Sequence, residues 1–236
     1  MDAGTMDETV SCIKERLDSG VFTQHVAVNV AKIVNMKKDL TLAQSVAACD
    51  LINIDGMGVV WGARILGEKV PERVAGIDLF ERLLQLAGEC GYPVYFLGGT
   101  DKVVERTVSV VKEKYLKLKV AGFHNGYFWE NEDEIVRDIR ASGARMLFVA
   151  ITSPKKENFI NKWKHELCVD FVMGVGGTFD VIAGKVRRAP LWMQRSGLEW
   201  LFRVFQEPKR MWRRYLITNA KFAVLMCRSY FSLGRN

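Results

Sequence analysis

Short, almost uninterrupted runs of apolar residues recur along this chain, separated by segments in which apolar residues follow helical spacing. The clearest runs are Val94–Leu97 and Met146–Ile151, and shorter ones lie at 25–29, 51–54, 119–122 and 171–175. Strands that are apolar on both faces are typical of a parallel sheet covered by two layers of helices. The pattern therefore predicts an α/β fold with a mainly parallel sheet and helices on both faces.

The helical segments are expected between these strands. Apolar residues repeat at helical intervals over 7–18, 31–37, 41–48, 78–88, 101–114, 132–142 and 158–165. Asp78 is expected to cap the helix that it begins. A chain of 236 residues is long enough for one such domain and an appendage.

The positive charge is concentrated at the end of the chain. Residues 185–236 contain 12 Lys and Arg but only 2 Asp and Glu, whereas the preceding 184 residues contain 22 and 25. Trp, Phe, Leu and Arg are interleaved after Pro190, which predicts two or three basic amphipathic helices, with Pro208 as a break or a start. We expect a core over 1–190 and a basic aromatic appendage over 191–236.

Such an appendage needs an anionic partner or surface. On a membrane surface, the aromatic side chains of the appendage would lie at the interface and its arginines would contact anionic headgroups. On a nucleic acid, the same arginines would contact phosphates and the aromatic side chains would stack on bases. A plain helical bundle would need no partner. The regular mixing of Trp, Phe and Arg favours the membrane surface over nucleic acid, and self-association through the appendage stays open.

Several features point to a protein of the reducing cytoplasm. No apolar run approaches the roughly 20 residues that span a bilayer, and the acidic first residues lack the order of a signal peptide. The five cysteines have no CxxC spacing, which excludes a recognisable zinc or disulfide framework. The three histidines are isolated and there is no Asp-x-Asp pair, so we expect neither a metal nor another cofactor.

Two glycine turns follow predicted strands. Gly98 and Gly99 precede a helix, where close backbone approach to a phosphate is possible, although a tight turn is an equal alternative. Gly174, Gly176 and Gly177 are more glycines than a turn requires, and favour contact with a nucleotide or diphosphate. The GxGxxG pattern of dinucleotide-dependent dehydrogenases is absent, which weighs against that class.

Charged residues beside these turns are candidates for chemistry. Asp55 follows the 51–54 strand, where open α/β sheets bind ligands, and could accept a proton, although an Asp-Gly turn is the simpler reading. Arg73 could bind an anion or only pair with Glu72. Asp180 could bind a ribose or base, or cap the next helix.

Taken in order, these segments resemble the WecG/TagA/CpsF glycosyltransferases. The resemblance is carried by the segments at 51–58, 72–79, 96–99, 153–157 and 174–180, and above all by Gly184–Pro190, Gly197–Trp200 and Glu207–Tyr215. It implies a Rossmann-like core and an inverting transfer without metal, most often of N-acetylmannosamine from a UDP-sugar to undecaprenyl-diphosphate N-acetylglucosamine for wall teichoic acid. Other members transfer N-acetylmannosaminuronic acid or glucose.

The resemblance also implies roles for single residues. Asp55 corresponds to the proposed base and Arg73 to the arginine before Val-Ala-Gly, while the arginines of the appendage would close over the site at the inner face of the membrane. Lys156 stands where the family often has Gln, and Ala27 where it usually has Thr. Residues and resemblance together predict substrate binding by Asn29, Gly98, Gly99, Lys156, Gly176, Gly177, Asp180, Arg188, Arg210, Arg213 and Arg214.

Overall fold

The computed structural model describes residues 4–233, with the backbone alone for Arg210 and Leu233. Its sheet has six parallel strands in the order β2-β1-β6-β5-β3-β4. The strands are β1 (Thr23–Val28), β2 (Leu51–Ile54), β3 (Val94–Gly98), β4 (Val120–His124), β5 (Met146–Ala150) and β6 (Phe171–Gly174). The prediction of a parallel α/β fold is confirmed.

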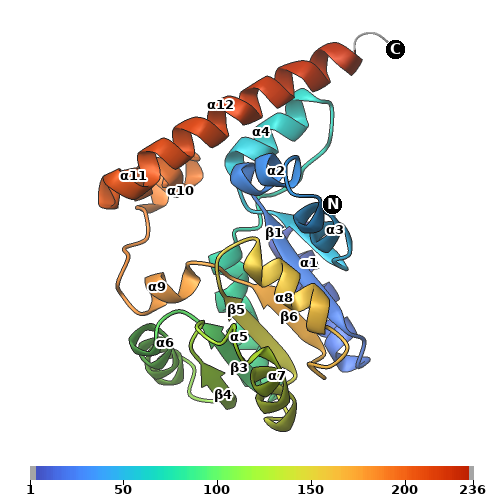
Figure 1. Ribbon diagram of the computed structural model, residues 1–236, viewed down its shortest axis with the longest axis vertical. Coiled ribbons are helices and arrows are strands. Elements are labelled where there is room, and N and C mark those ends of the chain that lie inside the picture. Colours follow the sequence, from blue (N-terminus) through green and yellow to red (C-terminus); the bar gives the residue numbers. More distant parts are fainter. Residues whose placement is uncertain (1–3, 234–236) are drawn as a thin grey trace.

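Helices cover both faces of the sheet (Figure 1). The core helices are α1 (Met6–Asp18), α2 (Val30–Met36), α3 (Leu40–Ala47), α4 (Met57–Ile65), α5 (Gly76–Cys90), α6 (Asp101–Lys114), α7 (Glu132–Ala141), α8 (Lys155–Trp163) and α9 (Thr178–Ile182). Buried side chains of α1, α5 and α6 pack with Phe96, Phe148 and Phe171 on one face. Those of α7 and α8 pack with Leu147 and Val172 on the other.

The segment after Pro190 forms three helices, α10 (Leu191–Arg195), α11 (Glu199–Gln206) and α12 (Pro208–Leu233). Pro208 begins α12, where its missing N–H costs no helical hydrogen bond. The long α12 helix lies beside α2 and α4 at one end of the molecule (Figure 1). A basic helical appendage is therefore confirmed, while its division from the core at Pro190 stays a prediction.

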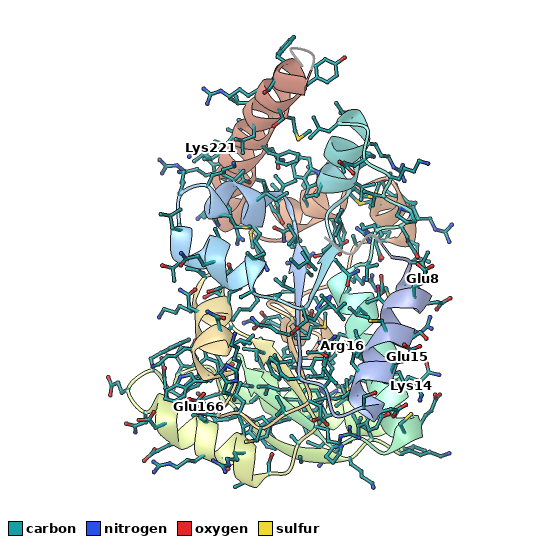
Figure 2. The ribbon with its side chains drawn as sticks, turned by 90° about the vertical axis from the view of Figure 1, so that its right-hand side faces the viewer. Glu8, Lys14, Glu15, Arg16, Glu166 and Lys221 are labelled. Atoms are coloured by element: carbon teal, nitrogen blue, oxygen red, sulfur yellow. The ribbon has the colours of Figure 1, made fainter. Side chains whose placement is uncertain are left out.

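Close contact between α4 and its neighbours depends on two glycines. A Cβ at Gly58 would lie 2.8 Å from Val30 Cγ2, and one at Gly62 would lie 3.0 Å from Phe222 Cζ and Met226 Sδ of α12. Gly62 therefore explains how α12 approaches α4 so closely, and Gly58 explains the close approach of α4 and α2. Figure 2 shows Lys221 of α12 at one end of the molecule and Glu166, just ahead of β6, toward the other.

The helix that was expected to begin at Asp78 starts two residues earlier. Its N-cap residue is Ala75, and Asp78 lies in the first turn. The prediction of an Asp78 cap is wrong because another carboxylate, that of Asp55, accepts the hydrogen bond of the Gly76 N–H group.

Candidate active site

The carboxyl edge of the sheet, where all six strands end, brings several predicted residues to one side of the molecule. Asn29 follows β1, Asp55 follows β2, Gly98 ends β3, and Gly176 follows β6. The connections that leave β3 and β5 run in opposite directions across the sheet. Open α/β folds bind ligands at such an edge.

Several charged side chains act on Asp55, namely those of Arg73, Glu199 and Arg203. The Asp55 Oδ1 atom accepts a hydrogen bond from the Gly76 N–H group at 3.1 Å. Burial raises the pKa of Asp55, although that hydrogen bond and the charges of Arg73 and Arg203 oppose the shift. A carboxylate with a raised pKa beside cations is suited to accept a proton near neutral pH.

Arg73 connects this group to the appendage. Its Nη1 atom lies 3.4 Å from Glu199 Oε2 of α11, and the two side chains are 15% and 24% exposed. The alternative of an Arg73–Glu72 pair is wrong, since Glu72 instead accepts a hydrogen bond from the Met6 N–H group. The ion pair holds α11 against the loop that precedes α5.

Arg203 of α11 is a residue that the sequence reasoning missed. It is half-buried, and a Cβ at Gly177 would lie 3.7 Å from its Nη1 atom. Burial raises the pKa of Asp55 and of Tyr215, and the charge of Arg203 opposes both rises. The guanidinium group therefore lies beside the glycine turn after β6 and acts electrostatically on Asp55, although the sequence alone showed only one more arginine in a basic segment.

The glycine turn after β6 borders a small cavity of about 40 Å³. Gly176 has φ 54°, and no atom lies within 4 Å of a Cβ placed on it, which leaves room for a ligand on that side. Asp180 lies inside α9 and pairs with Lys185 at 3.0 Å, so the reading of Asp180 as a helix cap is wrong. The cavity is lined by Gly177, Asp180, Val186, Arg203, Gln206 and Glu207.

The turn after β3 has a structural reason for its glycines. A Cβ at Gly98 would lie 2.4 Å from the Ala150 carbonyl oxygen, and φ is 125°. The Gly99 N–H group donates a hydrogen bond to the same Ala150 oxygen at 3.1 Å, and the Gly99 carbonyl oxygen accepts one from the Gly126 N–H group at 2.8 Å. Packing against β5 accounts for Gly98, whereas Gly99 has φ 74° and an added Cβ would lie 3.0 Å from Val103 Cγ1 of α6. Contact of either glycine with substrate stays a prediction.

Asn29 and Lys156 flank the end of β6. Asn29 is exposed, and its side chain accepts a hydrogen bond from the Lys32 N–H group at the start of α2. Lys156 is buried and pairs with Glu157. Burial and the charge of Lys32 lower the pKa of Lys156, and the charge of Arg214 on α12 adds to this shift.

The remaining predicted arginines do not all converge on Asp55. Arg188 is held by Asp78 in a two-pronged ion pair, with nitrogen to oxygen distances of 2.6 and 2.7 Å. Arg213 is exposed on α12. Arg210 belongs to α12, but its side chain lies outside the described part of the structure.

A resident metal ion has no evident ligand set here. Within residues 4–233, no group of three or more His, Cys, Asp and Glu side chains is arranged to hold an ion. The cations at the edge are instead protein side chains, including Arg73 and Arg203. Such groups can stabilise negative charge on a diphosphate.

Comparisons with known proteins show which proteins this chain is similar to. The N-acetylglucosaminyldiphosphoundecaprenol N-acetyl-beta-D-mannosaminyltransferase of Bacillus spizizenii is 38% identical over 170 residues, which is 72% of this chain and 65% of that protein. The match thus spans slightly less than two thirds of the relative. The profile of the glycosyl transferase WecG/TagA/CpsF family matches residues 1–236, and the chain belongs to this family.

Proposed function

We propose that the protein is an inverting glycosyltransferase that moves a sugar from a UDP-sugar to a polyprenyl-diphosphate-linked sugar. The observation that carries the proposal is the half-buried Asp55 side chain at the carboxyl edge, with the charges of Arg73 and Arg203 acting on it. The name of the Bacillus relative supports N-acetylmannosamine as the transferred sugar and undecaprenyl-diphosphate N-acetylglucosamine as the acceptor. Transfer of N-acetylmannosaminuronic acid or glucose is the alternative within the family.

Inversion needs a single displacement at the anomeric carbon of the donor. A hydroxyl oxygen of the acceptor forms the new bond, its proton passes to Asp55, and UDP leaves with the electron pair of the broken bond. Arg203 and the open glycine turn at Gly176 and Gly177 hold the diphosphate, so that negative charge develops beside a cation. No metal or other cofactor takes part in this proposed displacement.

The appendage is proposed to bring this site to its lipid acceptor at the inner face of the cell membrane. Within the described residues, no helix is long and apolar enough to cross a bilayer. Large apolar side chains nevertheless remain exposed on α10 to α12, among them Trp192 (64%), Phe205 (70%) and Trp212 (53%). Exposed aromatics beside arginines suit an anionic membrane surface.

The same segment also contacts the candidate active site, which favours a role in catalysis over a separate nucleic-acid-binding role. Glu199 pairs with Arg73, and Arg203 lies near Gly177.

Docking of the appendage to a membrane can be tested by flotation with vesicles that contain anionic lipid. Binding to these vesicles, but not to neutral ones, is expected, and equal recovery without vesicles would rule out membrane docking.

Transfer can be tested by mass spectrometry with a short-chain polyprenyl-diphosphate N-acetylglucosamine acceptor. UDP-N-acetylmannosamine, its uronic acid form and UDP-glucose are offered in parallel, with EDTA present. A disaccharide product from one donor is expected and would identify the sugar. If no donor gives a product with or without EDTA, the proposed reaction is wrong.

A further inference from the structure

A buried cluster of three charged side chains lies at the carboxyl edge, and the proposed proton transfer does not use it. It consists of Lys32 of α2 with Lys156 and Glu157 of α8, which are only 6%, 6% and 3% exposed. One carboxylate oxygen, Glu157 Oε1, lies 2.5 Å from Lys156 Nζ and 2.8 Å from Lys32 Nζ. We call these residues the Lys–Glu–Lys cluster.

The cluster contains more positive than negative charge. Its two ammonium groups share one carboxylate, and Arg214 of α12 adds a further positive charge nearby. Burial and the charge of Lys32 lower the pKa of Lys156 to about 8, so that Lys156 is mostly protonated at pH 7. A buried excess charge is unfavourable unless another group neutralises it, and a bound anion would do so.

The cluster also has an unused hydrogen-bond acceptor. Glu157 Oε2 is buried, yet it accepts no hydrogen bond from any residue between 4 and 233. Such an oxygen destabilises the folded protein because it has lost water without gaining a donor. A hydroxyl or amide of a ligand would supply that donor.

The position of the cluster is next to the candidate active site. The side chain of Lys156 crosses the end of β6, where a Cβ on Gly174 would lie 2.5 Å from its Cε atom. Lys32 lies three residues after Asn29, whose side-chain oxygen accepts a hydrogen bond from the Lys32 N–H group. Since β1 and β6 are neighbours in the sheet, the cluster borders both the Asn29 turn and the Gly176 turn.

We propose that the Lys–Glu–Lys cluster is a subsite for an anionic oxygen of a substrate, with Glu157 Oε2 accepting a hydrogen bond from an adjacent hydroxyl. The proposal rests on the proposed function for the identity of the substrate. A diphosphate and the carboxylate of a uronic acid sugar share the chemistry that this subsite recognises. Both are anions next to sugar hydroxyl groups.

The test is isothermal titration calorimetry of the full chain at pH 7. The ligands are UDP-N-acetylmannosamine, its uronic acid form, the short-chain acceptor and inorganic pyrophosphate. Lys156→Met removes the charge and keeps much of the side-chain length. Lys155→Met is the matched control, because Lys155 is exposed and contacts only the face of Trp129 among the interactions found for it.

Loss of a charge-assisted hydrogen bond is expected to raise Kd about tenfold or more in Lys156→Met, with no change in Lys155→Met. If both nucleotide sugars bind more weakly, the subsite holds the donor diphosphate. If only the uronic acid form binds more weakly, the subsite holds the sugar carboxylate. If only the acceptor binds more weakly, the subsite holds the lipid diphosphate. Unchanged Kd values for every ligand would overturn the proposal.

A stability measurement shows whether Lys156→Met is folded, and it also separates this proposal from the proposed function. The variant keeps the Lys32–Glu157 pair and loses the excess charge, so the Tm without ligand is expected to be equal to or above that of the wild type. Because binding of pyrophosphate does not require transfer, a Lys156-dependent Kd would support the subsite even if no disaccharide formed. A normal transfer assay with unchanged Kd values would reject the subsite alone.

Discussion

Asp55 Oδ1 accepts the hydrogen bond of the first amide of α5, that of Gly76, at 3.1 Å. The carboxylate thereby caps the helix and lies at the positive end of its dipole. Burial nevertheless raises the pKa of Asp55, because loss of water outweighs the hydrogen bond and the nearby arginines. The same contact therefore orients the carboxylate and limits the rise of its pKa.

Asp55→Asn should lower the rate of sugar transfer by about 10²-fold or more, since an amide cannot accept the proton of the attacking hydroxyl. The amide oxygen can still accept the Gly76 N–H group, so the fold should persist. The measurement is kcat with saturating donor and acceptor, beside Tm. Asp133→Asn, at an exposed position in the first turn of α7, is the control, and a normal rate in Asp55→Asn would reject the assignment of the base.

Stability should depend on pH through the same carboxyl group. Its pKa is higher in the folded state than the ordinary value of 3.8, so protonated Asp55 favours folding below that value and the benefit is lost as pH rises through the raised pKa. The Tm of Asp55→Asn minus that of the wild type should therefore grow from pH 4 upward and then level off. A difference that is constant over this range would contradict a raised pKa.

Arg203→Met should weaken UDP binding about tenfold and shift the pH dependence of transfer. The guanidinium group lowers the pKa of Asp55, so without it the pKa should rise and the acidic limb of the rate profile should move to higher pH. Arg195→Met, at an exposed position on α10, serves as the control. UDP affinity and a pH profile identical to those of the wild type would remove Arg203 from the site.

Gly98→Ala should destabilise the protein by about 2–5 kcal/mol, because the new Cβ meets the Ala150 carbonyl oxygen and the backbone is at φ 125°. Gly143→Ala is the matched substitution. Its φ is 67° and no atom lies within 4 Å of the added Cβ, so a cost of about 1–2 kcal/mol is expected from the backbone alone. The free energy of unfolding in urea measures both, and equal losses would show that the contact with Ala150 does not matter.

Most of the core could be predicted because its signals are local. The 51–54 strand and the 101–114 helix have the predicted bounds, since apolar runs and helical spacing reflect burial within a few residues. The α4 helix was missed because Gly58 and Gly62 lower its helix propensity. These glycines are required by tertiary packing. Gly58 leaves room for Val30, and Gly62 leaves room for Phe222 and Met226, which are distant in the chain.

The candidate site was predicted less completely than the fold. Asp55 and the glycine turns could be found because residues at the ends of parallel strands must share one edge. The partners of Arg73 and Arg188, which are Glu199 and Asp78, lie more than a hundred residues away in the chain. The Arg73–Glu199 pair depends on the docking of the appendage, and the Arg188–Asp78 pair depends on the path of the chain after α9. The position of Arg203 also follows from the docking of the appendage, and nothing in the spacing of residues distinguished Arg203 from other arginines of the basic segment.

The parallel arrangement of the strands also gives the molecule a face on which to attach probes. Cys90 ends α5 just before β3, and Cys168 precedes β6, so both lie at the edge opposite the candidate site, and both are exposed. A fluorophore or surface linker attached there would leave the Asp55 edge facing outward. With Cys227 of α12 replaced, single-molecule and immobilisation experiments could use the thiols that the chain already carries.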